Sequence, residues 1–159
     1  MILKRQEKNG KIKAMYSSST ICGSVYDTAT KELTVIFNNG GQYKYPDVAS
    51  TDYMRFETAD SNGSTFNTYI KKKYTTFEKL DKLSDTALAT ILKEVEELKG
   101  AEDTVSIEVR TKTMLEAMNV LLGSYIANGK VDADLLKKVE TKIGEYNKAS
   151  KPEPTTAND

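Results

Sequence analysis

The sequence predicts an α+β protein, in which a small antiparallel β-meander with short helices is followed by a three-helix C-terminal extension. The first observation is that residues 18–74 alternate β-prone runs with turn sequences. The second is that residues 84–148 repeat apolar side chains at helical spacing. We therefore expect a sheet unit with a helical cap at residues 1–80, a helical extension at 84–148 and a disordered tail at 149–159.

The sheet unit begins with strands that short turns connect. We expect a hairpin in residues 1–16 around Asn9-Gly10, and further strands at 20–26, 32–37 and 42–45. A second Asn-Gly pair, Asn39-Gly40, lies between the last two strands. Asn-Gly between β-prone runs favours a type I′ turn, because both central residues of that turn need φ > 0.

Two short helices are expected after the strands, and three longer ones after those. Residues 52–59 place Tyr53 and Phe56 three apart, which is typical of an amphipathic helix, and Asn62 begins a second helix that ends near Tyr74. Capping residues mark the helices of the extension. These are Ser84 to Gly100, Asp103 to Asn128-Gly129, and a third helix from Asp132.

The stretch from residue 107 to residue 126 is long and rich in apolar side chains for a surface helix. It fits two arrangements. It is either the centre of a monomeric helical bundle, since three helices can close their own core, or an interface between copies of the chain. We expect a homo-oligomer and leave both arrangements open.

Composition excludes several classes of function. The chain has no histidine and a single cysteine, Cys22, so zinc and copper sites, Ser-His-Asp triads and an intramolecular disulfide are not expected. We expect no cofactor, no metal and no enzymatic activity. The lone cysteine and the lack of an apolar signal stretch after Met1 lead us to expect a cytoplasmic protein. No apolar run approaches the length of about 18 residues that a membrane helix needs, so we expect no membrane partner.

The formal net charge is zero, but the charges are unevenly distributed. Residues 1–16 carry five basic side chains against the single Glu7, whereas acidic side chains outnumber basic ones in residues 85–148. Proteins that bind extended nucleic acid are usually basic, because their affinity comes from neutralising phosphates. A neutral chain therefore argues against an extended nucleic-acid surface, although one pocket can still hold one or two phosphates.

Several short motifs resemble the KTSC family, a small domain first noted at the C-termini of some lysyl-tRNA synthetases. They are Ser18-Ser19, Tyr26-Asp27, Leu33-Thr34-Val35-Ile36-Phe37 before the glycine turn, Tyr43-Lys44-Tyr45, and Ala59-Asp60-Ser61-Asn62-Gly63 with Phe66-Asn67. The resemblance covers about a third of the chain. It implies the meander and its helical cap, and RNA binding is the role suggested for the family.

Two groups of residues are candidates for a binding site. Tyr43 and Tyr45 lie two apart on one strand, so both rings face the same side, either as a stacking platform for a base or as part of the sheet core. The loop Ser61-Asn62-Gly63 leads into a helix and offers N–H groups to an anion, or is simply a helix cap.

Further candidates lie on the helices that follow. Phe66 and Asn67 begin the helix after that loop, where Asn67 can read a base edge or a ribose and Phe66 can equally belong to the core. Lys71 opens a run of three lysines, which attracts phosphate or is a solvated face. Arg55 and Arg110 are each expected either to clamp a phosphate or a base, or to pair with acidic neighbours.

These features favour a non-catalytic protein that binds a small nucleotide. Single-domain relatives of the KTSC family are common in bacteriophage genomes, and the Lys-, Asn- and Tyr-rich composition is compatible with a phage protein. The general build is similar to phage sponges that sequester cyclic nucleotide immune signals. We take such a sponge as the leading hypothesis. An RNA-binding or translation-associated module, and a structural or adaptor protein that binds partners through its helices, are the alternatives.

Overall fold

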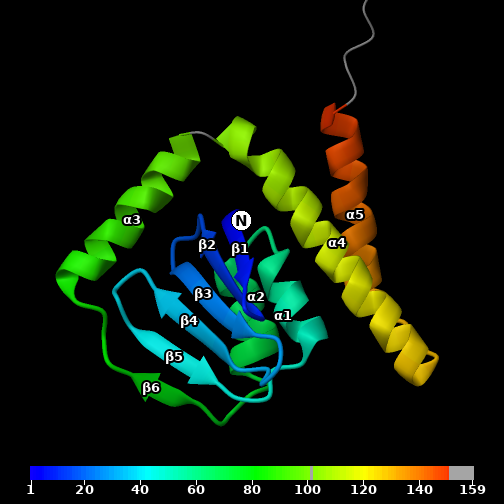
Figure 1. Cartoon of the computed structure of the whole chain (residues 1–159), viewed down its shortest axis with the longest axis horizontal. Helices are drawn as coiled ribbons and strands as arrows, with labels where there is room; N and C mark the ends of the chain where they lie inside the picture. Colours follow the sequence, from blue (N-terminus) through cyan, green and yellow to red (C-terminus); the bar gives the residue numbers. More distant parts are fainter. Residues whose placement is uncertain (101, 151–159) are drawn as a thin grey trace, which may run out of the picture.

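The computed structural model describes residues 1–100 and 102–150, with side chains described except at 102–108, 110 and 146–150. Its centre is one six-stranded antiparallel sheet in the order β1-β2-β3-β4-β5-β6, so every strand pairs with its neighbours in the chain (Figure 1). The strands are β1 (Ile2–Lys8), β2 (Lys11–Tyr16), β3 (Ile21–Asp27), β4 (Leu33–Phe37), β5 (Gln42–Tyr45) and β6 (Glu78–Leu80). The expected α+β class and meander are confirmed.

The two Asn-Gly turns differ. Asn9 and Gly10 have φ of 53° and 75°, as the type I′ turn between β1 and β2 requires. Between β4 and β5 only Gly40 has positive φ, at 90°, and its N–H donates to the Phe37 carbonyl at 2.9 Å. The Phe37 N–H in turn donates to the Gly41 carbonyl, which makes a longer turn with a glycine bulge. The expected type I′ turn is therefore wrong at this position.

One face of the sheet is covered by the short helices α1 (Ser50–Glu57) and α2 (Asn62–Thr65) and the π-helical turn η1 (Phe66–Lys71). The main core lies between them and the sheet. Its fully buried side chains include Tyr16, Ile21, Leu33, Val35, Phe56 and Ile70. The expected helices are confirmed, although the pattern did not distinguish the π-helical turn from α-helix.

The opposite face is covered by α3 (Asp85–Gly100), which begins where the Ser84 hydroxyl accepts the Ala87 N–H at 3.2 Å. Successive side chains of a strand point to opposite faces of the sheet, so every second residue points to this face. Leu3, Cys22 and Val95 form a second buried cluster there. The connection into α3 contains β6, which pairs with β5 and was not expected. Strand β6 has only three residues, which is too short for the alternation of apolar and polar side chains to be recognised in the sequence.

The last two helices pack beside the sheet rather than with α3. Helix α4 (Glu102–Asn128) contacts β1 and α1, and α5 (Ala133–Ser150) runs back along α4 (Figure 1). Their ends agree with the expected caps, since Gly129 has φ of 68° and the Asp132 carboxylate accepts the Leu135 N–H at 3.0 Å.

This placement excludes one of the two arrangements considered for the long helix, the three-helix bundle. The three helices of the extension do not form a bundle of their own, because the apolar side of α3 packs against the opposite face of the sheet. Helix α5 extends to Ser150, so residues 149 and 150 are helical where a disordered tail was expected, and residues 151–159 lie outside the described residues. Within the described part of the chain, no helix is long and apolar enough to cross a membrane.

Candidate functional site

A groove of about 760 Å³ opens beside β5 and β6, where η1 and the segment after it face the end of the sheet. We call it the aromatic groove, after the six rings that line it: Phe37, Tyr43, Tyr45, Phe66, Tyr74 and Phe77. Three lysines, Lys71, Lys79 and Lys82, share the wall with Asn39, Asn67 and Thr20. The groove thus gathers side chains from β4, β5, β6 and η1 and from the segments next to them.

The rings of the aromatic groove are packed edge to face, and two of them remain accessible. Tyr43 lies 5.5 Å from Phe37 and 5.7 Å from Phe77 between ring centroids. Tyr45 is only 4% exposed and packs against Phe66 at 5.7 Å, whereas Phe77 is 52% exposed. Tyr43 and Tyr45 therefore line the same groove, but Tyr45 and Phe66 belong mainly to the core. Phe77 is the ring most exposed to a ligand, and Tyr43 beside it is partly exposed.

The polar groups of the groove are placed for an anionic ligand. Lys71, Lys79 and Lys82 are all exposed, as is the Asn67 amide. Aromatic faces accept any nucleobase by stacking, and ammonium groups beside them attract phosphate. The arrangement can therefore hold a base and a phosphate at once.

A second hollow, of about 350 Å³, meets the aromatic groove at Thr20 and Asn67. Hydroxyl groups dominate its wall, which is formed by Ser17, Ser18, Ser19, Asp60, Ser61, Gly63 and Ser64. A Cβ added at Gly63 would lie 3.2 Å from the Thr20 hydroxyl, so glycine allows the loop to approach β3 closely. The Ser61 hydroxyl accepts the Ser64 N–H at 3.4 Å and caps α2, as the alternative interpretation of this loop expected.

Asn62 is not available to a ligand. Its side chain is fully buried, accepts a hydrogen bond from the N-terminal ammonium of Met1 at 2.7 Å and donates one to the Phe56 carbonyl at 2.9 Å. Both the oxygen and the NH₂ group of the amide are thus hydrogen-bonded within the protein. Asn62 therefore attaches the loop to Met1 and to α1. Asn67, which is exposed, remains the candidate amide donor for a ligand.

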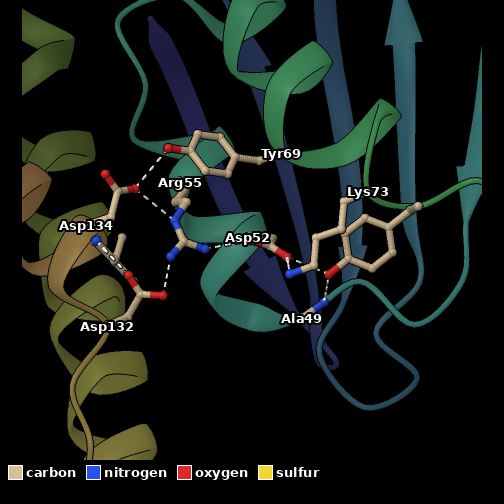
Figure 2. A network of polar contacts seen from close by, with 9 residues as sticks. Ala49, Asp52, Arg55, Tyr69, Lys73, Asp132 and Asp134 are labelled. Atoms are coloured by element: carbon tan, nitrogen blue, oxygen red, sulfur yellow. Dashed lines mark hydrogen bonds and ion pairs between the residues drawn. The ribbon is translucent and has the colours of Figure 1, made fainter.

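Arg55 lies in a polar network between α1 and the start of α5 (Figure 2), and it is not among the residues that line the aromatic groove. Its guanidinium donates to Asp52 at 2.6 Å, to Asp134 at 3.0 Å and to Asp132. The network joins α1 to the start of α5, so the pairing interpretation fits Arg55 better than the phosphate clamp. Arg110 lies in α4, but its side chain is outside the described residues.

The same network reaches the groove through Tyr74. The Tyr74 hydroxyl donates to Asp52 at 2.6 Å and accepts the Ala49 N–H at 2.9 Å, and Lys73 also donates to Asp52 (Figure 2). Burial and the hydrogen bond to Asp52 raise the pKa of Tyr74 to about 12. The hydrogen bonds to Asp52 and Ala49 thus fix the Tyr74 ring in the groove wall, and Asp52 also pairs with Arg55, which attaches α5.

Sequence reasoning missed three residues that complete the groove: Phe77, Lys79 and Lys82. One signal was present, because Phe77 is a lone large aromatic side chain in the polar stretch Thr75-Thr76-Phe77-Glu78-Lys79. What the sequence did not show is that β6 pairs with β5 and carries this stretch back to Tyr43.

Comparison with known proteins places the chain in a family. The KTSC domain family matches residues 17–74, from the start of β3 through η1, and so includes Tyr43, Tyr45, Phe66 and Asn67 but not Phe77. The crystal structure of a KTSC domain protein from Yersinia pestis is 30% identical, with 45% of this chain and 99% of that one covered and a TM-score of 0.42. No curated protein matches the chain. On the family match and this identity, the chain belongs to the KTSC domain family.

Proposed function

We propose that this protein is a non-catalytic binding protein that holds a small nucleotide in the aromatic groove. The observation that carries the proposal is the juxtaposition of two accessible rings, Tyr43 and Phe77, with the exposed Lys71, Lys79 and Lys82. Stacking is worth about 1–3 kcal/mol per base in nucleic-acid-binding proteins, and it needs no particular base. The lysines supply the attraction for phosphate.

The size of the groove favours a small ligand over a long strand. A volume of about 760 Å³ lies within the range of roughly 300–1,000 Å³ that is typical of small-molecule sites. The zero net charge of the chain supports the same conclusion, because affinity for extended nucleic acid depends on many phosphate contacts.

The chemistry of the wall supports binding without turnover. The described residues that line the aromatic groove are aromatic, amide, hydroxyl, lysine, glycine and leucine, with no carboxylate or thiol among them. No histidine occurs in the sequence to act as a general base. In its finer form the proposal is that the protein is phage-encoded and sequesters a cyclic nucleotide immune signal in the host cytoplasm.

The test is calorimetric titration of cyclic dinucleotides and cyclic ADP-ribose isomers into the parent protein and two variants. Phe77→Ala removes the exposed ring and is expected to weaken binding about 10- to 100-fold. Tyr45→Ala is a poorer probe than the sequence indicated, because Tyr45 is buried and its loss would disturb the core. Lys11→Ala, an exposed lysine at the far end of β2, is the control and should bind like the parent.

Chromatography of the recovered ligand completes the test. Intact ligand with affinity lost in Phe77→Ala supports the proposal, and cleaved ligand would overturn its non-catalytic part. If none of these nucleotides binds while generic single-stranded RNA binds tightly with a steep dependence on salt, the RNA-binding alternative replaces it. If neither class binds, the adaptor alternative, in which the helices bind partners, is the one to pursue.

A further inference from the structure

The outer face of α4 carries a line of exposed apolar side chains. Leu115 is 56% exposed, Met118 48%, Leu122 58%, Tyr125 56% and Ile126 76%. Their spacing of three and four residues places them along one side of the helix. We call these five residues the outer stripe. The opposite side of α4 already packs into the protein through Val109, Ala117 and Leu121.

The helix around the outer stripe lacks the charges of a solvated surface. From Ala117 to Gly129 the sequence AMNVLLGSYIANG contains no charged side chain on any side. Large apolar side chains that lie together on an exposed, uncharged surface mark an interaction site in many proteins. Residues 151–159, KPEPTTAND, contain no leucine, isoleucine, valine or aromatic residue, so this segment offers the stripe no large apolar side chain.

Four of the five residues of the outer stripe are spaced symmetrically about position 120, and Ile126 has no counterpart among them. Leu115 and Tyr125 each lie five residues from this position, and Met118 and Leu122 each lie two. Two antiparallel copies of α4 that cross at position 120 therefore place Leu115 against Tyr125 of the second copy and Met118 against Leu122. A two-fold interface uses the same patch on both subunits, so it requires this kind of self-complementarity.

The area available matches a modest dimer. Five large apolar side chains, each roughly half exposed or more, offer on the order of 400 Å² of apolar surface in one copy. Interfaces of homodimers are about two-thirds apolar, so two copies would bury roughly 1,200 Å² in total. That value lies at the lower limit of stable, specific interfaces and exceeds most crystal-packing contacts.

We propose that the outer stripe is covered by α4 of a second copy of this chain, packed antiparallel about a two-fold axis at position 120. The dimer does not depend on the aromatic groove, which lies at the other end of the sheet from β1, where α4 packs. Its test therefore succeeds or fails separately from the proposed function.

The first experiment is sedimentation equilibrium of the full chain at micromolar concentration. The parent should have twice the mass of one chain, and Leu122→Lys should raise the dissociation constant at least about tenfold, because it places a charge at the centre of the interface. Leu136→Lys, the same change at an exposed position of α5, is the matched control and should remain dimeric. Circular dichroism checks that each variant is folded. A monomeric parent overturns the proposal, as does a dimer that Leu122→Lys leaves intact.

The second experiment determines the orientation of the two helices. Antiparallel pairing predicts that Leu115→Cys chains form a disulfide with Tyr125→Cys chains when the two are mixed, and that neither variant cross-links efficiently with itself. The native Cys22 is buried and does not compete. Cross-linking within each variant alone, without cross-linking in the mixture, would indicate parallel pairing and overturn the proposed geometry.

Discussion

Apolar side chains are buried to different degrees in the sheet unit and in the helical extension. In the sheet unit, large side chains such as Tyr16, Leu33 and Phe56 have no exposed surface. In α4 and α5, the buried positions alternate with large apolar side chains that are about half exposed, Leu122 and Tyr125 among them. Helices α4 and α5 contribute buried side chains to the same main core as the sheet unit, but the outer side of α4 remains uncovered.

The two regions also use polar contacts differently. Among the side chains that the structure describes, ion pairs join the extension to the sheet unit through Lys4 with Glu94, Arg55 with Asp132 and Asp134, and Lys142 with Asp60. Most of these groups are partly exposed, and exposed ion pairs contribute little to stability. Because α4 leaves large apolar side chains uncovered and these ion pairs are partly exposed, we expect the extension to loosen more easily than the sheet.

The largest effect is expected from matched leucine truncations in the two regions. Leu33→Ala leaves a cavity in the main core and should lower the free energy of unfolding by about 2–5 kcal/mol. Leu122→Ala removes a side chain that is more than half exposed in one copy and should change the stability of the monomer by less than about 0.5 kcal/mol. Urea denaturation at a concentration where the chain is monomeric measures both. Equal losses in the two variants would contradict the comparison.

A smaller effect is expected from the attachment of α5. Arg55→Ala leaves Asp52 buried with fewer partners, and we expect a loss of roughly 2–3 kcal/mol, below the value for a fully buried pair because Asp134 is half exposed. Hydrogen exchange should accelerate in α5 and much less in β2 to β4. Lys99→Ala, which breaks an exposed pair with Glu96, is the control and should have almost no effect. Uniform acceleration across the sheet would show that the two regions unfold together.

A buried ion pair lies in the sheet unit itself. Glu57 of α1 has no exposed side-chain surface and accepts a hydrogen bond from Arg5 of β1, which is 5% exposed. The second Glu57 oxygen, one Arg5 nitrogen and the Tyr53 hydroxyl have no hydrogen-bond partner among the described residues. Burial raises the pKa of Glu57 to about 7, although the neighbouring Arg5 acts in the opposite direction.

This pKa gives the smallest of the expected effects, a dependence of stability on pH. Because the pKa in the folded chain lies above the ordinary value of 4.5, folded Glu57 holds a proton that the unfolded chain releases between these values. Its contribution to the free energy of unfolding is present at about pH 5 and is lost as pH rises through 7, a decrease on the order of 2 kcal/mol.

Glu57→Gln tests this dependence. The midpoint temperature of thermal unfolding should fall less steeply between about pH 5 and pH 8 in Glu57→Gln than in the parent, because the amide does not titrate. Glu94→Gln, at an exposed ion pair of α3, is the matched control and should keep the slope of the parent. An unchanged slope in Glu57→Gln would mean that the pair remains ionised over this range.

The sequence by itself determined the elements whose signals are local. Asn9-Gly10 specified its turn because both residues adopt positive φ without strain, and Ser84, Gly129 and Asp132 specified helix ends because caps act within one turn of the chain. It also brought Tyr43, Tyr45, Phe66, Asn67 and Lys71 forward as candidates, and all five line the aromatic groove.

Only the tertiary structure decided the features that depend on residues distant in the sequence. Strand β6 exists because β5 offers it a partner, and that pairing brings Phe77 to Tyr43. Asn62 is occupied because the N-terminal ammonium of Met1 lies beside it, and Arg55 is occupied because Asp132 and Asp134 arrive from a helix that begins 78 positions later. A hydrogen bond or ion pair forms only where donor and acceptor are close in space. The pattern of residues within one strand or helix does not show which residues of another element will lie beside it.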